Sequence, residues 1–108
     1  MITVKEIRND LKDIKYYYAR KDKIDKASAS IGANGIYEKV ERYNKAICKA
    51  PLRMYDLYVG LYQENNTLES LADSICYSFE YVAKLNQKLV KFFEKVLNEE
   101  EKGVQLWN

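Results

Sequence analysis

Apolar residues recur every three or four positions along most of the chain, a spacing that is typical of amphipathic helices. The first stripe starts behind Thr3 and Glu6, a pair that can form a capping box at the start of a helix. This stripe predicts one long N-terminal helix that runs to about Lys26. Its apolar positions are Val4, Ile7, Leu11, Ile14 and Tyr18.

Two further helices are predicted in the middle of the chain. Residues 27–35 are small and contain two glycines, which predicts a loop after the first helix. A second apolar stripe covers residues 36–49. Pro51 suits the first turn of a third helix, which the pattern carries to about Glu64. No segment shows the alternation of a strand, so we expect an all-α fold with four to five helices.

The C-terminal half carries the pattern of a helix-turn-helix. Asn66 and Glu69 can form a capping box for a short helix, and Ser78 can cap a second helix after a break at residues 76–78. Ala72 is small enough to allow two steeply crossed helices to approach closely. The positions expected to face inward are Leu68, Leu71, Ile75, Val82, Leu85, Leu89, Phe92 and Val96.

The last helix is expected to continue well beyond this motif. Its pattern runs to about Lys102, where Gly103 would end it as a C-cap. An apolar tail at residues 103–108 would then dock onto the domain or a second subunit. We therefore predict one domain over residues 1–108, made of an N-terminal helical hairpin (1–50), a helix-turn-helix region (51–102) and the tail.

Composition narrows the classes of function. The chain has no histidine, and its two cysteines form no CxxC pair, so no metal centre or cofactor is expected. The carboxylates are scattered on polar helix faces, and we predict no enzymatic activity and no small-molecule substrate. The charged N-terminus and the absence of a long apolar run predict a cytoplasmic protein without a membrane partner. The net charge of +2 permits nucleic-acid binding without requiring it.

Residues 57–93 resemble the helix-turn-helix of sigma-factor region four, as it occurs in small phage and prophage regulators of the ArpU and RinA type. The matching features are Leu61-Tyr62, Leu71-Ala72, Tyr77-Ser78, Val82 and Leu85. Cys76 occupies the turn position where glycine is usual. The resemblance implies a sequence-specific, DNA-binding transcriptional regulator that binds double-stranded DNA, often as a homodimer.

In such an arrangement the second helix would enter the major groove. Lys84 suits guanine or phosphate and Gln87 suits adenine, while Lys88 and Lys91 would hold phosphates. The lysine flank continues to Lys95, and the first helix could add phosphate contacts. The full set of candidate DNA-binding residues is Ser78, Phe79, Glu80, Ala83, Lys84, Gln87, Lys88 and Lys91, with Lys5, Arg8, Lys12 and Lys15 as the possible additions.

A protein-binding module is the alternative interpretation. The second helix has no arginine, and Phe79, Glu80 and Tyr81 form a poor surface for reading bases. The ten tyrosines also favour an interface. Such a phage-encoded module would bind RNA polymerase, a regulator or a host defence complex. The candidate partner or homodimer surface is Tyr16, Tyr17, Phe93, Leu97 and Trp107.

Overall fold

The computed structural model describes residues 1–31 and 35–107, with side chains described for 1–28 and 35–100. Over this part of the chain the fold is all-α and contains no strand, as the periodicity predicts. It has six α-helices and one π-helical segment, rather than four to five helices. They are α1 Val4–Ala19, α2 Lys21–Ile31, α3 Gly35–Ile47, α4 Leu52–Tyr58, the π-helical segment Val59–Gln63, α5 Leu68–Ser74 and α6 Phe79–Trp107.

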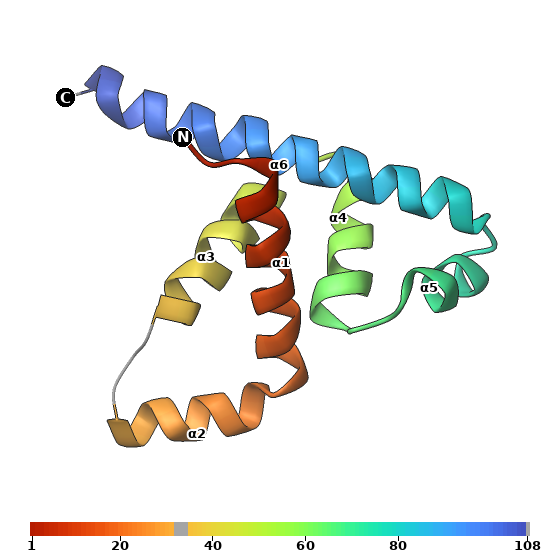
Figure 1. Ribbon diagram of the computed structural model, residues 1–108, viewed down its shortest axis with the longest axis horizontal. Coiled ribbons are helices and arrows are strands. Elements are labelled where there is room, and N and C mark those ends of the chain that lie inside the picture. Colours follow the sequence, from red (N-terminus) through yellow and green to blue (C-terminus); the bar gives the residue numbers. More distant parts are fainter. Residues whose placement is uncertain (32–34, 108) are drawn as a thin grey trace.

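The predicted long N-terminal helix is wrong, because it breaks into α1 and α2 at Arg20. Asp25 of α2 explains the direction of the bend. Its carboxylate accepts hydrogen bonds from the hydroxyls of Tyr17 in α1, at 3.1 Å, and Tyr37 in α3, at 2.6 Å. These bonds tie α2 back toward α3 (Figure 1). The predicted loop is also too long, since α2 extends to Ile31; residues 32–34 lie outside the described part.

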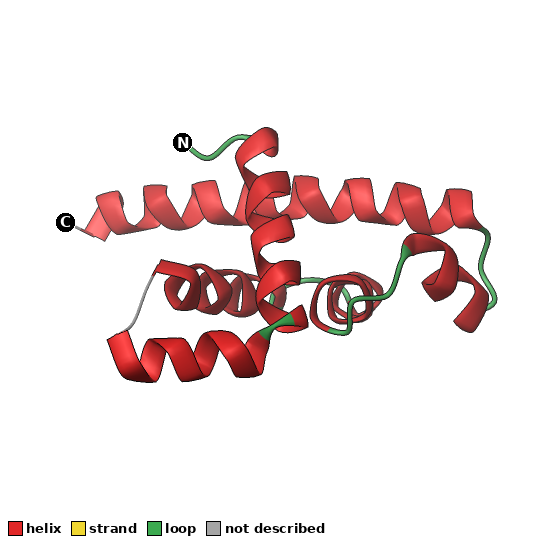
Figure 2. Ribbon diagram, turned by 60° about the horizontal axis from the view of Figure 1, so that its bottom comes forward, coloured by secondary structure: helices red, strands yellow, loops and turns green. Residues whose placement is uncertain are grey.

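Helix α6 runs the length of the molecule, and α1 lies across its middle (Figures 1 and 2). One face of α6 is buried in the core, where the ring of Phe93 packs between those of Tyr43 and Tyr58 at centroid distances of 4.9 and 5.7 Å. Gly103 does not end this helix, which continues to Trp107. A single glycine costs about 1 kcal/mol in a helix interior and need not stop it. Residues 103–107 of the expected separate tail therefore continue α6, and Asn108 lies outside the described part.

Most of the tyrosines cross-link helices. Seven of the ten form hydrogen bonds between different helical segments: Tyr17 and Tyr37 with Asp25, Tyr43 with Asp10, Tyr18 and Tyr58 with Asn44, Tyr62 with Asn86, and Tyr81 with Arg53. Each buries a ring while its hydroxyl meets a polar group on a neighbouring element. The tyrosine excess thus has a structural cause within the monomer.

Candidate nucleic-acid interface

Helix α5 begins one residue later than the sequence pattern predicts. Its capping box is Thr67 with Ser70: each side-chain oxygen accepts a hydrogen bond from the other residue's backbone N–H, at 3.0 Å in both cases. Asn66 is not the cap. Its side-chain amide instead donates to the carbonyl of Gly60 at 2.9 Å and so closes the end of the π-helical segment. The predicted pair of Asn66 and Glu69 is therefore wrong.

The turn between α5 and α6 lies where the sequence places it. Cys76 has a φ of 60°, the left-handed conformation that glycine adopts most readily. The backbone N–H of Tyr77 donates to the carbonyl of Ala72 at 3.0 Å and closes the turn. Ser78 then accepts a hydrogen bond from the backbone N–H of Tyr81 at 3.2 Å, and α6 starts at Phe79. The predicted break and the Ser78 cap are confirmed.

Most of the residues predicted to face inward from α5 and α6 are buried or half-buried. Leu71, Ala72 and Val82 are buried between α5 and α6. Ile75 is a correction, because 42% of it is exposed although the pattern places it inside. It is the C-cap of α5, where the chain reverses, and it lies on the rim of a hollow between α4, α5 and α6.

The candidate DNA-binding residues share the outer side of α6. Ala83 is half-buried and all the others are exposed: Ser78, Phe79, Glu80, Lys84, Gln87, Lys88 and Lys91. The buried residues of α6, such as Leu89 and Phe93, lie on the opposite side of the helix. This surface is therefore free to meet a partner without unfolding the core.

A shallow hollow brings residues of three helices to this surface. Arg8 of α1 and Met54 of α4 line it together with Lys84, Gln87, Lys88 and Lys91 of α6. The sequence singles out the four α6 residues and Arg8 separately, but it gives no signal that places Arg8 beside the lysines. That contact depends on the packing of α1 across α6, which is a tertiary feature.

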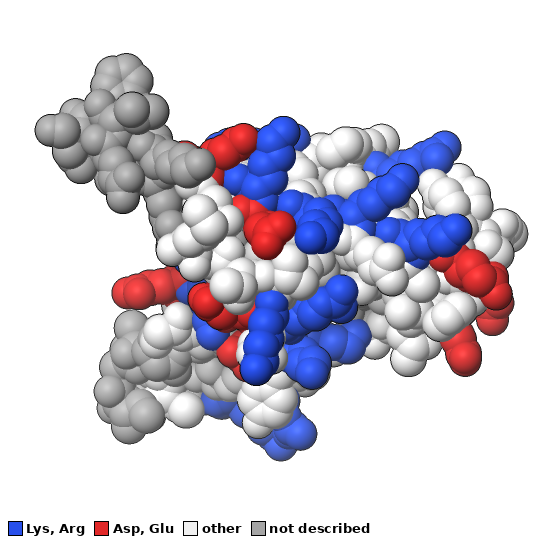
Figure 3. Space-filling view, turned by 45° about the horizontal axis from the view of Figure 1, so that its top comes forward, with Lys and Arg blue, Asp and Glu red and all other residues white. Residues whose placement is uncertain are grey.

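The hollow is rich in positive charge. Among the described residues Arg8, Lys84 and Lys88 have no ion-pair partner, and Lys91 meets Glu94 in an exposed contact of 3.8 Å, which neutralises little. Lys and Arg side chains gather across the middle of the face that carries α6 (Figure 3). A polyanion would therefore find several unneutralised cations side by side.

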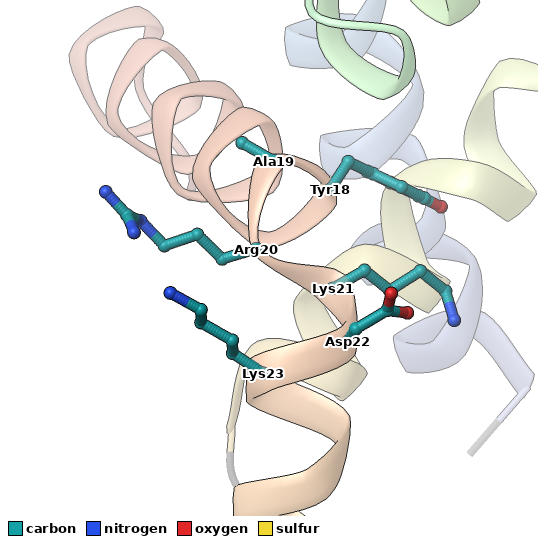
Figure 4. Close-up of a pocket in the computed structure, with 6 residues that line it drawn as sticks. All are labelled: Tyr18, Ala19, Arg20, Lys21, Asp22 and Lys23. Atoms are coloured by element: carbon teal, nitrogen blue, oxygen red, sulfur yellow. The ribbon is translucent and has the colours of Figure 1, made fainter.

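The bend between α1 and α2 also borders a shallow depression, lined by residues 18–23. In Figure 4, Arg20 and Lys23 point to one side of the bend, whereas Tyr18 and Lys21 point to the other. Lys21 forms an ion pair with Asp25 at 2.9 Å. Because these side chains diverge, the bend does not assemble a binding site.

The candidate partner surface is not a single surface. Phe93, Leu97 and Tyr17 are buried in the monomer, because α6 is covered by several helices and Tyr17 packs at the α1–α2 bend. The prediction that they face a partner is wrong. Tyr16 is 59% exposed, and the side chain of Trp107 lies outside the described part of the chain.

Comparisons of the chain with protein-family models, curated proteins and solved structures found no match. The likeness to phage regulators thus stays a prediction from the sequence. In the part of the chain that the structure describes, no helix has both the length and the apolar character needed to cross a membrane. The described residues also include no group of three or more Cys, Asp or Glu placed to hold a metal ion.

Proposed function

We propose that the protein binds double-stranded DNA through α5 and α6, as a helix-turn-helix regulator of the phage or prophage type. The observation that carries this proposal is the cluster of Arg8, Lys84, Lys88 and Lys91 around the exposed side of α6. The left-handed turn at Cys76 and the Ser78 cap support it, because they set a second helix at the surface as a recognition helix requires.

The residues of the proposed interface would make two kinds of contact with DNA, to the bases and to the phosphates. Lys84 and Gln87 lie where α6 would meet base edges, and these side chains can donate to guanine and pair with adenine. Arg8, Lys88 and Lys91 would hold phosphates and fix the register. Glu80 lies near the start of α6 and would accept from cytosine, whereas on a phosphate it would repel.

The test is a double substitution, Lys84→Ala with Gln87→Ala. A preferred duplex is first selected from a random library with the wild-type protein, and affinities are then measured by fluorescence anisotropy. Each good base contact is worth about 1–3 kcal/mol of discrimination, or roughly 5- to 150-fold in Kd. We expect the preference over random duplex to disappear, while the thermal midpoint stays constant because both side chains are exposed.

Lys45→Ala is the matched control. It removes one positive charge from an exposed position on α3, where Lys45 meets Glu41 at 3.0 Å. It should leave sequence preference intact. If the double variant retains the wild-type preference, α6 does not read the bases and the proposal fails.

Binding to a protein is the second candidate, and one observation favours it. Three apolar side chains surround the α5–α6 turn with 42–45% of their area exposed: Ile75, Tyr77 and Phe79. Exposed aromatic residues are typical of protein interfaces. This function predicts a complex that survives nuclease treatment and is lost on Phe79→Ala. If the Phe79→Ala variant recovers the same partners as the wild-type protein, the protein-binding function loses its support.

A further inference from the structure

Helix α1 has a second basic surface, separate from the residues that α6 carries. Lys5, Arg8 and Lys12 are spaced three and four residues apart and are all exposed, so they lie on one side of the helix. Arg20 follows at the end of α1, with its guanidinium 5.0 Å from the centre of the Tyr16 ring. We refer to Lys5, Arg8, Lys12, Tyr16 and Arg20 as the α1 basic face.

The three acidic residues of α1 make contacts outside the α1 basic face. Glu6, in the first turn, accepts a hydrogen bond from the hydroxyl of Thr3 at 3.2 Å. Asp10 and Asp13 bind the ammonium of Lys39 on α3, at 3.2 and 2.8 Å, and Asp10 also accepts a hydrogen bond from the hydroxyl of Tyr43 at 2.7 Å. Their negative charge is therefore neutralised on the flank of α1 that packs against α3. This separation leaves the opposite flank with positive charge.

The positive charges of the α1 basic face are not neutralised by carboxylates within the fold. Within the described residues Lys5, Arg8, Lys12 and Arg20 have no ion-pair partner. Lys15 is different, because its ammonium donates to the backbone carbonyls of Leu61 and Asn66 and so fixes the end of the π-helical segment. We leave Lys15 out of the face because those bonds occupy it.

The α1 basic face is continuous with the surface of α6. Arg8 lines the hollow that Lys84, Lys88 and Lys91 also line. Further along α1, Lys12, Tyr16 and Arg20 line a second hollow beside Asn65. Because α1 lies across α6, the two rows of cations run in different directions (Figure 1).

We propose that the α1 basic face binds the sugar-phosphate backbone of the same DNA, beside the segment that α6 reads; this rests on the DNA binding proposed above. From Lys5 to Arg20 the helix rises about 22 Å, which is less than the roughly 34–36 Å of one DNA turn. The face therefore follows one stretch of backbone. Contacts to phosphates carry no sequence information, so the contribution of the α1 basic face is independent of sequence.

Tyr16 adds a donor in the middle of this face. Its side chain is 59% exposed and lies between Lys12 and Arg20 around the second hollow. A tyrosine hydroxyl donates well to a phosphate oxygen. The exposed hydroxyl of Tyr16 would therefore donate a hydrogen bond to a phosphate of the bound DNA.

The test is the full chain with Lys5→Gln, Arg8→Gln and Lys12→Gln together, titrated with the selected duplex and a random duplex at several salt concentrations. The slope of log K against log salt is negative, and each lost phosphate contact reduces its magnitude by about 0.9. We expect the slope to become less negative by roughly 2 to 3, with weaker binding to both duplexes and an unchanged ratio between them.

A control variant with the same loss of charge separates local contact from net charge. Lys21→Gln, Lys45→Gln and Lys49→Gln remove three exposed lysines, each of which meets a carboxylate of its own chain. Lys21 points away from Arg20 at the α1–α2 bend (Figure 4). The control should keep nearly the wild-type salt slope. Circular dichroism at matched temperature checks that both variants stay folded.

Three outcomes overturn the proposal, and they are distinguishable. If the α1 variant and the control have equal slopes, the α1 basic face makes no contact and Arg8 holds no phosphate, while base reading by Lys84 and Gln87 is untouched. If the α1 variant changes the ratio between selected and random duplex, the face reads bases rather than backbone. If the wild-type chain binds neither duplex at low salt, the proposed function itself fails.

Discussion

Replacing Asn44 by alanine should destabilise the fold more than any exposed substitution on the same helix. Asn44 of α3 connects three other segments. Its side-chain oxygen accepts hydrogen bonds from the hydroxyl of Tyr58 in α4, at 2.8 Å, and from the amide of Gln63, at 3.1 Å. Its amide donates to the hydroxyl of Tyr18 in α1 at 3.0 Å.

The size of the effect follows from burial. Tyr58 is fully buried, so its hydroxyl would lose its acceptor in a place that water does not reach. Leaving a buried donor unsatisfied costs about 1–3 kcal/mol, and a lost hydrogen bond whose groups can reach water costs about 1 kcal/mol. Tyr18 and Gln63 are half-buried and fall in the second class. We therefore expect Asn44→Ala to lower the free energy of unfolding by roughly 2–4 kcal/mol.

Urea denaturation followed by circular dichroism measures this change, with Lys45→Ala as the exposed neighbour on α3. A cycle with Tyr58→Phe isolates the main contact. In the Tyr58→Phe background no hydroxyl is left stranded, so Asn44→Ala should cost about 1–2 kcal/mol less. Equal costs in the two backgrounds, or a cost no larger than that of Lys45→Ala, would refute the reasoning.

Three further changes test the packing, the turn and the buried tyrosines. A Cβ on Gly60 would lie 2.9 Å from Cδ1 of the buried Leu71, which has little room to turn away. Overpacking costs about 1–3 kcal/mol and alanine gains about 1 kcal/mol over glycine in a helix, so Gly60→Ala should lower stability by up to about 2 kcal/mol in urea denaturation. Cys76 is exposed and has a φ of 60°, so Cys76→Gly should raise the thermal midpoint, in keeping with relief of about 1 kcal/mol of strain. Burial raises the pKa of Tyr43 and Tyr58 above the usual 10, so their contribution to stability is complete below pH 10 and is lost as the pH rises further. The urea midpoint should therefore fall as the pH rises above 10, and it should fall less steeply in Tyr58→Phe. A wild-type midpoint that stays constant above pH 10 would contradict the raised pKa values of the two tyrosines.

Local signals explain what the sequence predicts well. The turn at Cys76 and the Ser78 cap depend on residues within a few positions of one another, so their side-chain types are sufficient evidence. The same holds for α3, whose apolar spacing places Val40, Tyr43 and Ile47 inside. Its bounds of Gly35–Ile47 agree with the predicted range to within two residues.

The failures come from hydrogen-bond partners that belong to neighbouring helical segments rather than to the same helical turn. Asp25 bends the first helix because Tyr17 and Tyr37 approach it from two other helices. Asn66 has the right type for a cap but is used by the carbonyl of Gly60, which belongs to a π-helical turn that the apolar pattern does not reveal. The apolar spacing of three and four residues does not reveal either of these competing sets of hydrogen bonds.

In the candidate site, too, local patterns predict some features well, whereas features set by the packing of other helices are missed. The pattern of α6 correctly exposes Lys84, Gln87, Lys88 and Lys91, because the opposite side is apolar. It fails for Phe93 and Leu97, which are buried next to the predicted stripe. Helices α1, α3, α4 and α5 all pack on α6, so its buried arc is wider than one stripe.

This arrangement makes α6 the central helix of the core and the helix that carries the proposed binding surface. Val82 and Leu89 are fully buried on one side, while the lysines lie on the other. A surface built on a packed helix needs little ordering when a partner binds, so its cations keep their spacing in the free protein. The angle between the two basic rows is set in turn by the packing of α1 on α6, whose buried residues, Ile7 and Leu89 among them, belong to the same core. The proposed fit to one curved DNA backbone would therefore depend on core packing as well as on charge, and the lysines alone, moved to a flexible loop, would not reproduce it.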